Sequence, residues 1–145
     1  MVLNQATDYA LRISLFLAKQ ENDSVIQANS IQYEERIPKR FLFKIMRSLI
    51  KAGIVKSVRG KNGGFILGRN PEDISLYNIV EAIEGTLILN HCLIDPSRCN
   101  KDATGYCVVH LELAKLREGL IHKFQSVNLK MFLESKHPVV DKLPS

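Results

Sequence analysis

Three cysteines in the second half of the chain are the residues best suited to chemistry. Cys92, Cys99 and Cys107 have six and then seven residues between them, in a segment whose Asp, Pro, Ser and Gly residues are typical of a loop. His110 follows Cys107 by three residues, so the two share one face of a predicted helix. Three thiolates and an imidazole can together bind a metal ion or an iron–sulfur cluster. Incidental clustering is the alternative, because the spacing lacks the Cys-x-x-Cys pairs of zinc fingers.

The sequence favours a reducing compartment for these thiols. We expect no signal peptide, and no apolar run approaches the roughly 20 residues that a membrane span needs. A cytoplasmic protein without a membrane partner is therefore predicted, and a structural disulfide is disfavoured in it. No paired carboxylates and no Ser/His/Asp set stand out, and 145 residues provide one small domain and one extra helix. An enzyme is not expected.

Positive charge is confined to one quarter of the chain. Between Arg36 and Pro71 there are ten Lys or Arg residues and no Asp or Glu. The whole chain has 20 basic and 15 acidic residues, so the remainder has 10 basic against 15 acidic. Such a local imbalance is typical of a nucleic-acid-binding surface.

The first part of this basic stretch is predicted to form an amphipathic helix over residues 38–52. Pro38 suits the first helical position, and Gly53 suits the residue just past a helix end. Four cations fall within roughly 60° of one another on a helical wheel, with apolar residues opposite. They are Arg40, Lys44, Arg47 and Lys51. A solvated surface helix would by itself explain this stripe, so the residues after the helix decide between that reading and a DNA-binding one.

These next residues predict a small hairpin. Residues 54–58 and 65–67 suit two strands, and residues 59–64 form a turn with three glycines and two cations. Helix, strand, basic turn and strand is the layout of a winged helix-turn-helix, whose helix enters the major groove of DNA. The turn joins strands and lacks the Gly-Lys-Ser/Thr ending of a phosphate-binding loop. The predicted contacts to double-stranded DNA are Lys39, Arg40, Lys44, Arg47, Arg59 and Lys61.

The rest of the first 90 residues completes this domain. Helices are predicted at 6–19, at 27–33 as the first helix of the helix-turn-helix, and from a Ser75 cap to Glu84. The predicted fold class is mainly α with a small β wing. Residues 1–90 would form the DNA-binding domain, and residues 91–107 a cysteine loop.

Residues 108–135 predict a long dimerisation helix. Apolar residues step by threes and fours along it, as in the seam of a coiled coil. They are Val109, Leu113, Leu116, Leu120, Phe124, Val127 and Met131. A core helix of a monomer is the alternative, and a break is predicted at 126–128, where Asn128 can cap a short last turn. Residues 136–145 are predicted to be a loose tail.

Short motifs are spread over nearly the whole chain, at residues 7–12 (TDYALR), 37–38 (IP), 40–42 (RFL), 51–55 (KAGIV), 57–60 (SVRG), 63–65 (GGF), 74–76 (ISL) and 80–85 (VEAIEG). Together they resemble the Rrf-type winged-helix regulators, the bacterial family of IscR, NsrR and RirA. The resemblance implies a homodimeric transcription factor, repressor or activator. An iron–sulfur cluster in it would sense cluster supply, iron, redox state or nitric oxide.

The resemblance also implies a ligand set. The three cysteines match the family's cluster loop, although its cluster-binding members mostly have shorter spacings. His110 stands where IscR-like members have a ligating histidine, and Asp8 stands where NsrR-like members have a ligating aspartate. The cluster, two-iron or four-iron, thus has two candidate fourth ligands. A structural zinc site and a cluster-free thiol switch are the alternatives.

Overall fold

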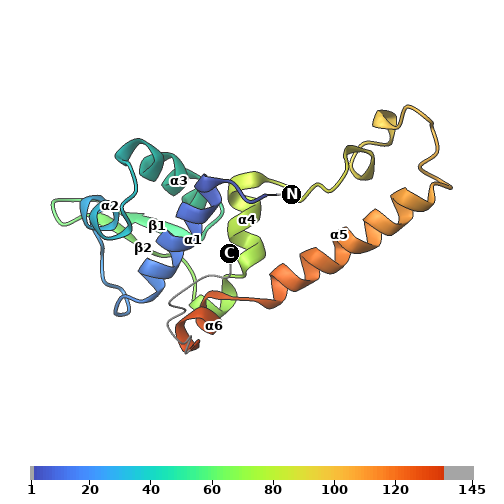
Figure 1. Cartoon of the computed structure of the whole chain (residues 1–145). Coiled ribbons are helices and arrows are strands. Elements are labelled where there is room, and N and C mark those ends of the chain that lie inside the picture. The colour runs from blue at the N-terminus through green and yellow to red at the C-terminus, as the bar shows by residue number, and fades with distance from the viewer. Residues whose placement is uncertain (1, 136–145) are drawn as a thin grey trace, which may run out of the picture.

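The computed structural model describes residues 2–135, and the predicted tail at 136–145 lies outside these residues. A winged-helix body precedes a long arm (Figure 1). The body contains α1 (Gln5–Ala18), α2 (Ala28–Glu35), α3 (Lys39–Lys51), β1 (Val55–Val58), β2 (Gly64–Leu67), the 3-10 helix η1 (Pro71–Asp73) and α4 (Leu76–Glu84). The 3-10 helices η2 (His91–Leu93) and η3 (Pro96–Arg98), α5 (Val108–Ser126) and α6 (Leu129–Glu134) follow. The predicted fold class is confirmed.

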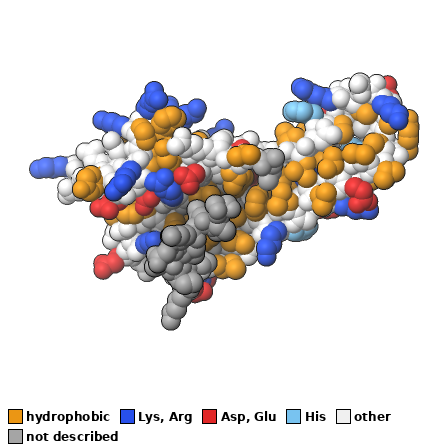
Figure 2. All heavy atoms as spheres, viewed as in Figure 1, with side chains coloured by type: hydrophobic (Ala, Val, Ile, Leu, Met, Phe, Trp, Pro, Cys, Tyr) orange, Lys and Arg blue, Asp and Glu red, His pale blue; other side chains and the backbone are white. Residues whose placement is uncertain are grey.

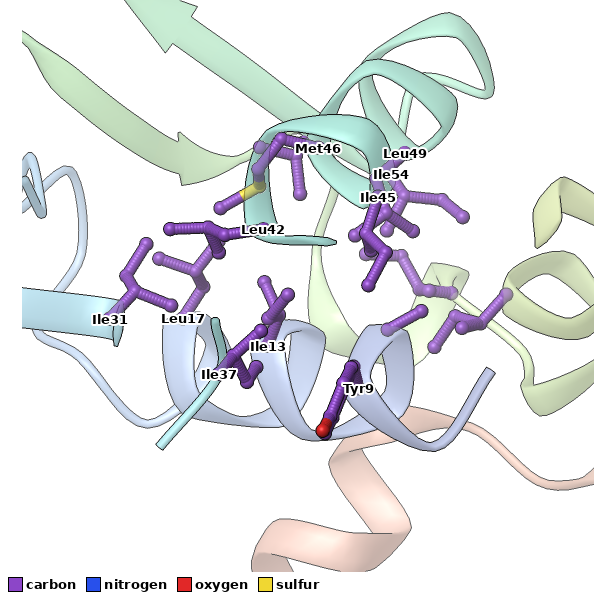
Figure 3. Packing of buried hydrophobic residues seen from close by; sticks show 14 of the residues in the cluster. Tyr9, Ile13, Leu17, Ile31, Ile37, Leu42, Ile45, Met46, Leu49 and Ile54 are labelled. Carbon is purple, nitrogen blue, oxygen red and sulfur yellow. The ribbon is translucent and has the colours of Figure 1, made fainter. Parts of the chain in front are cut away.

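The core of the body lies between α1, α3 and α4. Ile13 of α1 and Leu42 and Leu49 of α3 are completely buried, and their side chains point toward one another (Figure 3). Fully burying such a side chain stabilises the fold by roughly 1.5–3 kcal/mol. The apolar side of α3 is therefore fixed inward, so the opposite side of this helix faces solvent.

Polar contacts at the helix ends fix α1 against α4. The Asn4 side chain caps α1 by accepting from the Thr7 N–H at 2.9 Å. The buried Thr7 hydroxyl donates to Glu84 at the end of α4 over 2.6 Å. Ser75 caps α4 as predicted, in a reciprocal capping box with Asn78. Each good cap stabilises by about 1 kcal/mol.

The wing is a two-stranded antiparallel sheet in which Val55 pairs with Leu67 and Val58 with Gly64. Ile26, between α1 and α2, adds an isolated bridge to Phe65 with hydrogen bonds of 2.9 and 2.8 Å. A side chain at Gly64 would overlap the Ile26 carbonyl. The wing is thereby attached to the body at its base, and its Gly-rich turn extends away.

The arm differs from one continuous helix. The α5 helix ends at Ser126, Val127 is extended and accepts a 2.7 Å hydrogen bond from the Leu76 N–H, and Asn128 caps α6. The predicted break is confirmed, and Leu129, 2% exposed, inserts into the core of the body. The arm is not one continuous helix because the hydrogen bond between Leu76 and Val127 directs the chain back to the body. Val127 and Met131 consequently lie beyond α5, so the predicted apolar seam is restricted to residues 109–124.

Candidate DNA-binding surface and cysteine site

The exposed side of α3 is cationic. Lys39, Arg40, Lys44 and Arg47 are all exposed, while the apolar residues on the opposite side are buried. Figure 2 shows Lys and Arg side chains gathered at the winged-helix end of the molecule. The guanidinium of Arg40 lies 4.9 Å from the centre of the Phe41 ring, a cation–π contact that restricts its direction. This side of α3 can bind a polyanion.

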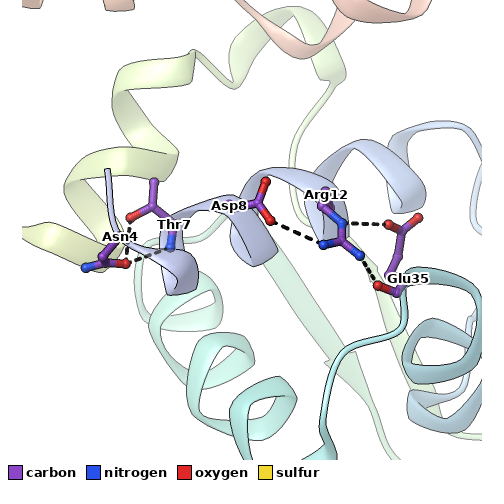
Figure 4. Close-up of polar contacts among 5 residues, drawn as sticks. All are labelled: Asn4, Thr7, Asp8, Arg12 and Glu35. Carbon is purple, nitrogen blue, oxygen red and sulfur yellow. Dashed lines mark hydrogen bonds and ion pairs between the residues drawn. The ribbon is translucent and has the colours of Figure 1, made fainter. Parts of the chain in front are cut away.

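The turn before α3 is held by Arg12, which sequence reasoning did not assign. Its guanidinium donates to Asp8 at 3.2 Å and to the Glu35 carboxylate at 3.3 Å, and also to the Glu35 carbonyl (Figure 4). Partial burial lowers the pKa of Arg12, but the hydrogen bonds and charges of Asp8 and Glu35 outweigh it and raise that pKa. Arg36 follows with a left-handed φ of 52°. Arg12 thus links α1 to the end of α2, which positions α3.

The wing brings two further cations to the body. Arg59 and Lys61 are exposed in the turn between β1 and β2. Gly60 has a φ of 114°, and a side chain at Gly63 would overlap the Val58 carbonyl, so the turn requires glycine at these places. All six predicted DNA contacts therefore lie on the exposed surface of α3 or at the wing tip.

Two thiols of the cysteine loop contact His110, one at its ring and one at its backbone. Cys92 lies in η2, with its Sγ 3.4 Å from His110 Nδ1. Cys107 caps α5, and its Sγ accepts from the His110 backbone N–H at 3.5 Å. The loop chain and the first turns of α5 thus run side by side at the far end of the arm (Figure 1).

Cys99 is held within its own part of the loop. Its Sγ accepts from the Ala103 N–H at 3.5 Å, and Ala103 is buried. Hydrogen bonds from the backbone N–H groups of Ala103 and Lys101 lower the pKa of the Cys99 thiol. All three cysteines are free and half-buried. The thiolate of Cys99 is therefore easier to form than that of an ordinary cysteine, which suits both metal binding and redox chemistry.

The predicted ligands do not all meet. Across residues 2–135 no group of three or more His, Cys, Asp or Glu residues is arranged to hold a metal ion. Asp8 lies on α1, in its ion pair with Arg12. The donor chemistry of three free thiols and an imidazole fits a metal or cluster, but ligation would have to bring these donors closer together.

One side of α5 is apolar and open. No residue of this 19-residue helix is buried, and Val109 and Leu116 are 64% and 63% exposed. Figure 2 shows hydrophobic side chains along the arm. Another side of α5 faces the chain that leads from α4, where Arg117 donates to the Leu87 carbonyl at 2.7 Å. Such an exposed apolar stripe is unusual for a monomer.

No helix within the described part of the chain is long and apolar enough to cross a membrane.

Comparisons with known proteins agree with this architecture. The model of the Rrf2 family, described as an iron-dependent transcriptional regulator, matches residues 3–135. The HTH-type transcriptional regulator NsrR of Shouchella clausii is 31% identical over 90% of this chain and 82% of its own. The structure of T. potens IscR matches with a TM-score of 0.74 at 23% identity, over 99% of this chain and 94% of that one. CymR of B. subtilis matches with a TM-score of 0.71 at 22% identity, over 92% and 97%.

The match to the family model extends over the winged helix, the cysteine loop and α5 together. The two structures, both under 25% identical, establish the winged-helix fold. The family and the NsrR relative are regulators of transcription rather than enzymes. The chain belongs to the Rrf2 family of transcriptional regulators.

Proposed function

We propose that the protein is a cytoplasmic homodimer that binds a pseudo-palindromic DNA operator and senses its signal through an iron–sulfur cluster on the cysteine loop. The observation that carries the DNA-binding part is the position of the cations. Arg40 and Lys44 on α3, and Arg59 on the wing, are exposed, while the opposite, apolar side of α3 is buried in the core. A helix in the major groove and a wing on the neighbouring backbone fit this arrangement.

Dimerisation is supported by the apolar seam of α5, in which Val109 and Leu116 are exposed while Leu113, Leu120 and Phe124 are half-buried in the single chain. These residues fall within roughly 80° on a helical wheel. Pairing two such stripes would remove apolar surface from water. Two-fold dimers place their recognition helices in grooves about 34 Å apart on paired half-sites.

The cluster would be held by Cys92, Cys99 and Cys107, with either His110 or Asp8 as fourth ligand. His110 is supported as the fourth ligand because its ring nitrogen Nδ1 lies 3.4 Å from the Cys92 sulfur. Asp8 would have to leave Arg12, and this ion pair is only weakly stabilising because the two side chains are 60% and 38% exposed. When bound, an iron–sulfur cluster supplies iron and sulfide that react with oxidants or nitric oxide, and the chain supplies the ligands and their protonation state.

A thiol switch is the second candidate function. The lowered pKa of the half-buried Cys99 thiol supports it, because a thiolate is the form that oxidants attack. A structural zinc site is the third, using the same donors.

Anaerobic purification followed by a visible spectrum and by iron, sulfide and zinc analysis separates these three candidates. Visible absorption with matching iron and sulfide supports the cluster. Colourless protein with stoichiometric zinc would contradict it, and colourless metal-free protein would favour the thiol switch. If a cluster is present, His110→Ala and Asp8→Ala identify the fourth ligand, since only the variant lacking it should change the spectrum.

A further inference from the structure

Phe43 is a large apolar side chain on the exposed side of α3, between the cations Lys39 and Arg47. Lys39, Phe43 and Arg47 succeed one another at four-residue steps, so they form one ridge on the helix. The Phe43 side chain is 42% exposed, and it is absent from the residues that build or cover the core in the described chain. Phe41, by contrast, packs against the core, with its ring 6.2 Å from that of Tyr9. The helix thus packs one phenylalanine against the core and exposes the other.

The surroundings of Phe43 restrict what it can contact. Lys39 and Arg47 stand one turn before and after it, and both are exposed. An apolar protein surface docked here would have to desolvate these cations, which is costly, whereas DNA would pair them with phosphates. The charge around the ring therefore favours a polyanion as the occupant of this side of α3.

Within the major groove, one group matches a phenyl ring. The 5-methyl of thymine is the apolar group among base edges that otherwise present hydrogen-bond donors and acceptors. We propose that Phe43 is a specificity residue that reads thymine 5-methyl groups in each half-site by apolar contact. This inference rests on the DNA-binding function proposed above and adds a preference for particular bases.

The test removes the methyl group without changing base pairing. A duplex is first selected from a random pool by the full-length protein under anaerobic conditions at fixed salt. Each thymine is then replaced in turn by deoxyuridine, and the dissociation constant is measured by fluorescence anisotropy. Losing one buried methyl should weaken binding by about fourfold. We expect this loss at one or two thymines per half-site for the unaltered protein, and none at those thymines for Phe43→Ala.

Tyr33→Ala is the matched control. Tyr33 is 81% exposed on α2, outside the α3 ridge, so this variant should respond to deoxyuridine as the unaltered protein does. Phe43→Leu keeps an apolar group and should retain part of the response. Thermal melting of each variant checks that the fold is kept, which we expect because Phe43 lies outside the core.

Failure of the inference is distinct from failure of the proposed function. If no duplex is selected from the pool, DNA binding itself is wrong. If a duplex is selected but no thymine responds, or Phe43→Ala responds as the unaltered protein does, Phe43 does not read thymine. Equal weakening of Phe43→Ala on every duplex, including an unselected one, would likewise overturn the inference, because it would show a backbone contact.

Discussion

Replacing Leu116 with Asp tests whether the seam of α5 is buried between two copies of the chain. The Leu116 side chain is 63% exposed in the single chain. Complete burial of a leucine stabilises by roughly 1.5–3 kcal/mol, so covering this exposed part contributes about 1–2 kcal/mol per copy. A two-fold dimer contains the residue twice, which gives about 2–4 kcal/mol. The dissociation constant of the dimer should rise roughly 30- to 1,000-fold, before adding the cost of desolvating a carboxylate.

Sedimentation velocity over a concentration series measures this change. Leu111→Asp is the matched control, because Leu111 is 49% exposed on the same helix but lies roughly 140° away around its axis. That variant should remain dimeric. An unchanged dimer in Leu116→Asp, or an equal loss in Leu111→Asp, would refute the placement of the seam. If α5 were simply a surface helix of a monomer, each substitution would change stability by no more than about 0.5 kcal/mol.

Three further predictions concern DNA, the turn before α3, and the loop. Arg40→Ala and Arg59→Ala should each weaken operator binding in anisotropy titrations, by about 1–3 kcal/mol where the arginine reads a base; unchanged binding by both would contradict the proposed surface. Arg12→Leu should lower the free energy of unfolding in urea by only about 1 kcal/mol, since the Arg12 side chain is 38% exposed. It should nevertheless weaken operator binding, because the turn before α3 is loosened. Full operator affinity in this variant would show that Arg12 does not position α3. Replacing any one cysteine of the loop by Ala should abolish the cluster absorption and change operator affinity, while the unfolding temperature of the winged-helix body stays the same. Identical operator binding by all three variants and by the cluster-loaded protein would show that the cluster is not the switch.

Much of the body could be predicted because its signals are local. The alternation of buried and exposed residues on α3, the Ser75 cap of α4 and the Asn128 cap of α6 each depend on residues within one or two turns. The Gly-rich turn between two short apolar runs likewise defines the wing. Propensity, capping and periodicity carry such information without knowledge of distant contacts.

The contacts that sequence reasoning missed join residues far apart in the chain. Arg12 and Glu35 are 23 positions apart, and nothing in either local sequence specifies the partner. The pairing of Leu76 with Val127, which ends α5, is of the same kind. The positions of the three thiols also depend on how the loop lies against α5, which spacing alone does not determine. For the role of Arg12, the sequence offers one local signal, its i,i+4 spacing from Asp8, which indicates an ion pair on one face of α1.

The proposed seam and the proposed cluster site share one helix, and this has a consequence for signalling. Cys107 caps the first turn of α5, and the far end of α5 is tied to the body through Val127 and Leu129. In the proposed dimer, a change at the cysteine loop would therefore act on the element that sets the distance between the two recognition helices. A cluster shifts such an equilibrium only through a difference in interaction energy between two conformations. Under the proposed function, ligation would provide that difference, because the three thiols and His110 do not form a metal-binding group in the described chain and the loop would have to rearrange to gather them.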